Sequence, residues 1–199
     1  MIKSLKFKIK GASPLMMHSP RGINPRDPLK VEIAKLTSIR SNKRSEDQET
    51  EIHRLEFMMG LYLDEKVGPY VPGIAIEACI RDGARVSRKG KSIESGVFVA
   101  EDVVPLGYKG PRDPESLWAD ANFVDQRRAT VGKAGVLRTR PIFHDWTLEF
   151  GVNYDPDQVN KDDLIEFVKT AGAVKGLLEH RPRFGRFTVE SAKDGKGII

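Results

Sequence analysis

The strongest constraint on the fold is a segment in which apolar and polar residues alternate one by one. Its apolar members are Trp146, Leu148, Phe150, Val152 and Tyr154. A period of two is typical of a β-strand that buries one face and exposes the other. Residues 145–154 are therefore predicted to form the clearest strand of the chain.

Other segments place this strand in a defined order of elements. Residues 3–10 repeat the alternation, with Leu5, Phe7 and Ile9 on one face and lysines on the other. Apolar residues recur at helical spacing in two segments, and Asn160 stands where it would cap the second. The predicted helices span 74–88 and 161–175, and the remaining strands lie around 96–99, 102–108 and 186–191. This order predicts an α+β fold with a ferredoxin-like, RRM-like split β-α-β-β-α-β core.

A length of 199 residues favours a single domain, 1–199, interrupted by two long insertions. The core elements are expected at 3–11, 71–108 and 145–191. The first insertion, 12–70, combines a Pro- and Gly-rich loop without regular structure with a helix at 29–40 and a second helix. Ser45 and Gln48 have the spacing of a capping box at the start of that second helix. The second insertion, 109–144, is predicted to form a basic arm, in which residues 126–140 form a hairpin or a flexible pair of basic strands. Residues 110–122 give at most one helical turn. In the core, residues 90–95 are predicted to form a loop.

Several classes of protein are excluded by composition. Cys79 is the single cysteine, so no internal disulfide can form. No stretch approaches the roughly 18 apolar residues that span a membrane, and the N-terminus alternates lysine with apolar residues, unlike a signal peptide. We therefore expect a cytoplasmic protein without a membrane partner. Nucleotide-binding loops, hydrolase elbows and zinc-protease motifs are missing, and the four histidines are widely spread, so no cofactor and no metal site are expected.

Residues 176–190 read GLLEHRPRFGRFTVE and combine glycine, arginine and phenylalanine between a helix and a strand. Glycines and guanidinium groups can bring backbone N–H groups and positive charge close to phosphates. Phe184 can stack on a base. The alternative is a solvated loop whose aromatic side chains fill the core. Both interpretations are open at this level.

Two more segments are rich in basic residues, 81–91 and 126–140, and the latter contains no acid. Glu77 and Arg81 have the i,i+4 spacing of a helical ion pair. A basic run without neutralising partners favours an anionic ligand. The candidate nucleic-acid-binding residues are Arg81, Arg85, Arg127, Arg128, Lys133, Arg138, Arg140, His180, Arg181, Arg183, Phe184 and Arg186.

Residues Val71 to Arg81, VPGIAIEACIR, resemble the Pro-Gly helix start of the RAMP superfamily. These proteins are the RNA-binding subunits of CRISPR effector complexes, with ferredoxin-like cores. A glycine-rich loop lies between their second helix and last strand, where Gly176 to Gly185 stand here. The resemblance implies a non-catalytic protein that binds single-stranded nucleic acid, RNA rather than DNA, and assembles as a homo-oligomer along the strand.

The chain also resembles small proteins of tailed phages that end in a similar RPRFGRF segment. This implies a phage origin, a host-cell cytoplasm location and an alternative function. The chain would then mimic or block a CRISPR effector, or bind a phage protein, through protein–protein contacts. A third alternative is a weak endoribonuclease using His18, Asp27 or the His144–Asp145 pair. Some RAMP subunits carry an RNA-cleaving aspartate in a loop comparable to that of Asp27. We expect no catalytic residue.

Overall fold

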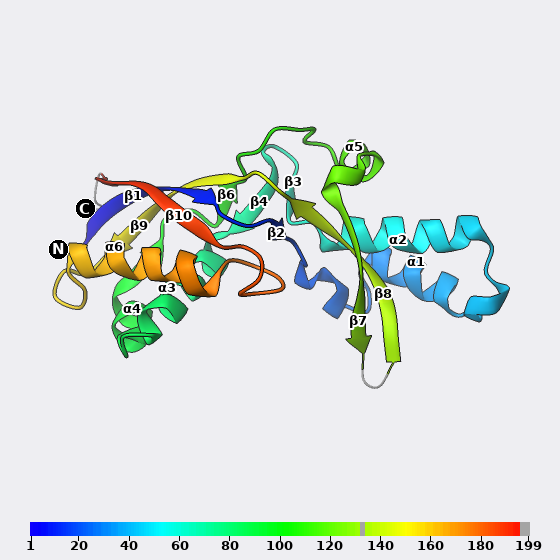
Figure 1. The fold of residues 1–199 in the computed structure, drawn as a ribbon, viewed down its shortest axis with the longest axis horizontal. Helices are drawn as coiled ribbons and strands as arrows, with labels where there is room; N and C mark the ends of the chain where they lie inside the picture. Colours follow the sequence, from blue (N-terminus) through cyan, green and yellow to red (C-terminus); the bar gives the residue numbers. More distant parts are fainter. Residues whose placement is uncertain (132–133, 196–199) are drawn as a thin grey trace. The chain divides into compact units, whose positions relative to one another are not determined.

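The computed structural model describes residues 1–131 and 134–195 (Figure 1). The chain forms two compact units. The first consists of Met1–Met16, Asp64–Lys109 and Phe143–Ile199. The second consists of Met17–Leu63 and Gly110–Ile142, and is therefore built from two segments that interrupt the first.

The first unit is organised around a four-stranded antiparallel sheet with the order β10-β1-β9-β5. Its strands are β1 (Lys3–Gly11), β5 (Val97–Val99), β9 (Thr147–Tyr154) and β10 (Phe187–Asp194). Helix α3 (Gly73–Arg85) lies between β1 and β5 in sequence, and α6 (Lys161–Thr170) lies between β9 and β10. Counted within this core, the strand order is 4-1-3-2, which is that of a split β-α-β-β-α-β fold. The predicted α+β, ferredoxin-like class is confirmed.

Apolar and polar residues alternate along the two central strands, β1 and β9, so one face of the sheet is apolar and is covered by helices. Leu5, Phe7 and Ile9 of β1 are buried, and the rings of Phe7 and Phe150 stack with centroids 5.7 Å apart. Helices α3 and α6 lie side by side on this face (Figure 1). Gly83 permits their close approach, because a Cβ there would lie 2.6 Å from the carbonyl oxygen of Phe167.

The rest of the first unit differs from the predictions in three places. Residues 90–95, expected as a loop, form α4 (Gly90–Gly96), whose Ile93 is buried; this burial stabilises a short helix that has no side-chain cap. The strand predicted at 102–108 is shorter, β6 (Val103–Pro105), and pairs with β4 (Gly68–Pro72). Glu77 does not pair with Arg81, because its Oε1 accepts a hydrogen bond of 2.8 Å from the backbone N of Val99. The unit also contains β2 (Leu15–Met16) and the π-helical turn η4 (Ala171–Lys175).

The second unit contains a pair of helices and a β-hairpin. Helices α1 (Pro28–Thr37) and α2 (Glu46–Gly60) pack together, and Ser45 and Gln48 form the predicted capping box. Strands β7 (Val124–Val131) and β8 (Ala134–Phe143) pair as the predicted hairpin. The Pro- and Gly-rich segment is not wholly irregular, because it contains a 3-10 turn, η1 (Pro20–Ile23), which the Ser19 side chain caps. The remaining elements of this unit are η2 (Ser41–Lys43), α5 (Pro114–Ala119) and η3 (Ala121–Phe123). Strand β3 (Leu63–Asp64) pairs with β4, and the boundary between the two units in the sequence falls within it.

None of the helices in the described ranges is both long enough and apolar enough to cross a lipid bilayer.

Candidate nucleic-acid interface

The loop between η4 and β10, residues 176–186, is held by its two glycines. Gly176 and Gly185 have φ angles of +77° and +71°. The backbone N of Leu177 donates to the carbonyl oxygen of Gly185 over 2.9 Å, and the N of Gly185 donates to Pro14 O over 2.8 Å. A Cβ at Gly185 would lie 2.0 Å from the carbonyl oxygen of Leu177. Glycine is therefore required here both by the positive φ and by the closeness of the backbone.

The aromatic side chains of this loop region point into the protein. Phe184 is only 9% exposed, and its ring lies edge-on to the exposed His180 with centroids 6.1 Å apart. Phe187 is buried and contacts Trp146 in the same manner, at 6.4 Å. Of the two sequence-based alternatives for Phe184, this burial favours the core over base stacking.

Asp82 joins the loop to the C-terminal end of α3. Its carboxylate lies 2.8 Å from the Arg85 guanidinium and 3.5 Å from that of Arg181. Nearby, the Cys79 thiol donates to the carbonyl oxygen of Gly176 over 3.2 Å. The structure thus brings two of the three basic segments, 81–91 and 176–186, together in the first unit.

Arg81 is oriented differently from its neighbours. Its side chain is 33% exposed and lies 3.9 Å from the carboxylate of Glu94 in α4. Its Nε atom is buried and has no hydrogen-bond partner in the described residues. Arg81 is therefore partly enclosed between helices, whereas Arg85 is 59% exposed.

A groove of about 590 Å³ lies beside the loop, and we call it the basic groove. Its charged lining residues are Lys169, Arg183 and Arg186, and no carboxylate lines it; Ser13 and Thr188 add hydroxyl groups. The Arg186 guanidinium donates to the carbonyl oxygen of Ala173, which fixes its position. Within the described ranges Arg183 makes no hydrogen bond and no ion pair. The basic groove combines one fixed and one unpartnered guanidinium, a geometry suited to phosphate oxygens.

The candidates of the third basic segment lie on the hairpin of the second unit. The expectation that nothing neutralises them is wrong, since Arg127 pairs with Asp125 and Arg138 pairs with the buried carboxylate of Glu56. Arg128 is exposed, Arg140 is half-buried, and Lys133 lies outside the described residues. Two acids, one of them far away in sequence, thus reduce the net charge of this segment.

The residues of the catalytic alternative are His18, Asp27, His144 and Asp145, and Asp27 has a structural role. Asp27 is the N-cap of α1: its Oδ1 accepts from the backbone N of Leu29, and its Oδ2 from Arg21 Nε, both over 3.0 Å. His18 is exposed in the second unit, whereas His144 and Asp145 occupy an exposed turn of the first. In residues 1–131 and 134–195, no three His, Cys, Asp or Glu side chains are grouped so that they could hold a metal ion.

Sequence reasoning missed three charged residues of the two candidate sites. Lys169 lies in the last turn of α6 and lines the basic groove, and its position just before η4 and the loop was a usable signal. The pairs of Asp82 with Arg181 and of Glu56 with Arg138 were missed because the partners are distant in sequence. Ion pairs between residues so far apart cannot be predicted from a local sequence pattern.

No protein-family model and no curated protein matches the chain. The chain is similar in structure to a chain of a solved complex described as "Cryo-EM structure of the Type III-B Cmr-beta bound to cognate target RNA". The two share 11% sequence identity with a TM-score of 0.49, and the match covers 98% of this chain and 61% of that one, so this chain spans less than two thirds of that chain's length. At this identity and TM-score we draw the function from the residues of this chain and not from that complex.

Proposed function

We propose that the chain binds single-stranded nucleic acid, without cleaving it, through the basic groove and the adjoining loop of the first unit. The observation that carries this proposal is the lining of the groove, whose charged residues, Lys169, Arg183 and Arg186, are all cations. The Glu166 carboxylate lies 3.6 Å from Lys169 Nζ but is not part of that lining. A concave surface with three cations attracts a polyanion. Positively charged grooves follow the backbone of single strands in proteins that bind them without sequence preference.

The phosphate backbone is the part of the ligand that these residues would hold. Arg183 and Arg186 supply forked N–H donors that match phosphate oxygens, and Lys169 supplies a point charge. Arg85 and Arg181, joined by Asp82, extend the positive surface from the loop to the end of α3. Because Phe184 and Phe187 are buried, we propose that the groove contacts the phosphate backbone of the nucleic acid and not its bases. Binding should therefore show only weak sequence preference.

RNA is proposed over DNA, and assembly of several copies along one strand is proposed, from the sequence resemblance of residues 71–81 and of the loop. Neither follows from the charges of the groove. RNA and DNA of the same sequence therefore need to be compared directly, since only the 2′-hydroxyl distinguishes them. Light scattering of the complex on strands of increasing length counts the bound copies.

The experiment that tests the proposal is fluorescence anisotropy with a labelled single-stranded RNA of mixed sequence. The double variant Arg183→Gln with Arg186→Gln should bind at least about tenfold more weakly, since each phosphate contact contributes on the order of 1 kcal/mol. Lys66→Gln is the first control, because it removes one exposed charge of the same unit outside the groove. Lys66→Gln with Lys109→Gln is the second, because it removes two exposed charges of the same unit outside the groove and outside the three basic segments. Equal losses in the double variant and the two-charge control would show a diffuse charge effect, and an unchanged affinity in the double variant would refute the proposal.

A further inference from the structure

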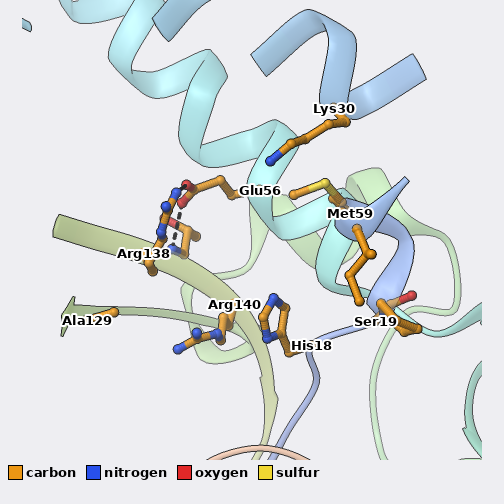
Figure 2. A pocket seen from close by; sticks show the side chains of 12 residues that line it. His18, Ser19, Lys30, Glu56, Met59, Ala129, Arg138 and Arg140 are labelled. Carbon is orange, nitrogen blue, oxygen red and sulfur yellow. Dashed lines mark hydrogen bonds and ion pairs between the residues drawn. The ribbon is translucent and has the colours of Figure 1, made fainter. Parts of the chain in front are cut away.

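A second concave site lies entirely in the second unit and is independent of the proposed function. It has a volume of about 500 Å³, within the usual range of small-molecule sites. Its lining comes from η1, α1, α2 and both strands of the hairpin (Figure 2). The charged and titratable residues are His18, Lys30, Glu56, Arg138 and Arg140.

The buried carboxylate of Glu56 organises one wall. The Glu56 side chain is 6% exposed, and it accepts hydrogen bonds from the Arg138 guanidinium and, over 3.0 Å, from the backbone N of Thr139. The hydroxyl of Thr139 in turn lies 2.9 Å from His53 Nδ1. The Glu56 carboxylate is therefore already hydrogen-bonded to protein groups. It holds the Arg138 side chain in position, and that side chain is 41% exposed at the pocket.

The pocket carries excess positive charge. With His18 neutral, three cations and the single carboxylate of Glu56 leave a formal charge of +2. Figure 2 shows Lys30 above the opening, with Arg140 and His18 below it. In the part of the chain that the structure describes, Lys30 makes no hydrogen bond and no ion pair. Its ammonium is the one cation of the wall without a protein partner there.

The remaining surface of the pocket is apolar. Met59, Ile23 and Ala129 line it, and the Met59 sulfur packs so closely on η1 that a Cβ at Gly22 would lie 3.0 Å from it. A thioether is polarisable and contacts aromatic rings favourably. One pocket thus offers a surface for a flat ring and, beside it, a group of cations.

We propose that this pocket binds a nucleoside monophosphate. The base lies against Met59 and Ile23, and the phosphate is held by Lys30, Arg138 and Arg140. A phosphate monoester carries about two negative charges at neutral pH, which matches the formal charge of the pocket, whereas a diester carries one. The pocket therefore prefers a terminal phosphate to an internal one.

Isothermal titration calorimetry of the full chain tests this with AMP, adenosine and the dinucleoside diester ApA. AMP should bind. ApA should bind at least about tenfold more weakly, which corresponds to the loss of one charge-assisted contact, and adenosine, which has no phosphate, should bind more weakly still. Lys30→Gln should weaken AMP binding by a similar factor, and Lys30→Arg should restore most of it. The matched control is Lys35→Gln, which removes a lysine of the same helix that pairs with Glu32 outside the pocket.

Three results would overturn the proposal: AMP binding that Lys30→Gln leaves unchanged, equal affinity for AMP and ApA, or no heat on addition of AMP. The two sites are separable, since the double variant Arg183→Gln with Arg186→Gln should bind AMP like the wild type. Loss of RNA binding in that variant with AMP binding intact supports both sites. Loss of AMP binding in that variant would contradict a separate pocket in the second unit.

Discussion

The carboxylate of Asp82 lies 3.5 Å from the guanidinium of Arg181, and this pair connects the end of α3 to the loop 99 residues later in the sequence. The same carboxylate lies 2.8 Å from Arg85. One acid therefore holds two arginines of the proposed interface in place and also neutralises part of their charge.

Replacing Asp82 tests which of these effects dominates. Asp82→Asn should tighten binding of single-stranded RNA about two- to fivefold at low salt, because a half-exposed ion pair is worth at most about 1 kcal/mol and its removal frees positive charge. Anisotropy titrations measure this effect. Asp157→Asn, an exposed change of equal charge in the same unit, controls for net charge. Weaker binding by Asp82→Asn would mean that orientation of Arg181 matters more than its charge.

Gly185 is predicted to be indispensable for the shape of the loop. Gly185→Ala should lower the free energy of unfolding by roughly 1–3 kcal/mol, because the positive φ and the Leu177 carbonyl both oppose a Cβ. RNA affinity should fall with it, since the loop carries Arg181 and Arg183. Urea unfolding and anisotropy report the two losses. Gly151→Ala, whose Cβ would meet Ala100 at 3.3 Å, should change stability far less; equal effects would contradict the loop geometry.

The thiol of Cys79 is predicted to be unreactive in the folded protein. Burial raises its pKa to about 12 from 9.0, the Arg181 charge opposes this rise, and Asp82 adds to it. Because the folded pKa is raised, the stabilisation is complete below about pH 9.0 and is lost as the pH rises toward 12. Ellman's reagent should label native protein slowly at pH 8 and urea-unfolded protein at once. Between pH 9 and 12, wild-type stability should fall more steeply than that of Cys79→Ala. Rapid native labelling would contradict this assignment.

Asp27 is predicted to act as a helix cap and not as a catalyst. Asp27→Ala should destabilise the protein by about 1–2 kcal/mol, because the cap of α1 is lost, while Asp27→Asn retains a capping oxygen and costs less. Thermal melts measure the difference. An RNA-cleaving activity that Asp27→Asn abolishes at unchanged stability would restore the endoribonuclease alternative.

The core of the fold could be predicted because its signals are local. Alternation in β1 and β9 and the Asn160 cap of α6 each depend on neighbouring residues, and their order specifies the sheet topology. The Ser45 capping box and the β7–β8 hairpin were predictable for the same reason. Helix α4 was not, because it depends on the burial of Ile93 rather than on helix signals.

The candidate site was only partly predictable, since its charges pair over long distances. The arginines of the loop were evident from the composition of the segment. Asp82, however, pairs with Arg181, 99 residues later, and Glu56 pairs with Arg138, 82 residues later. The burial of Phe184 could not be predicted either. A phenylalanine in a basic loop is surrounded by the same sequence whether its ring is buried or exposed.

The most direct test of the proposed function is the salt dependence of RNA binding. The logarithm of the binding constant for single strands falls with the logarithm of salt concentration by about 0.7 for each neutralised phosphate, so the three groove cations predict a slope of about −2 or steeper. The double variant Arg183→Gln with Arg186→Gln should lose about 1.4 of that slope. A wild-type slope near zero, or the same slope in the variant, would contradict the proposal that the basic groove binds the phosphates of the RNA.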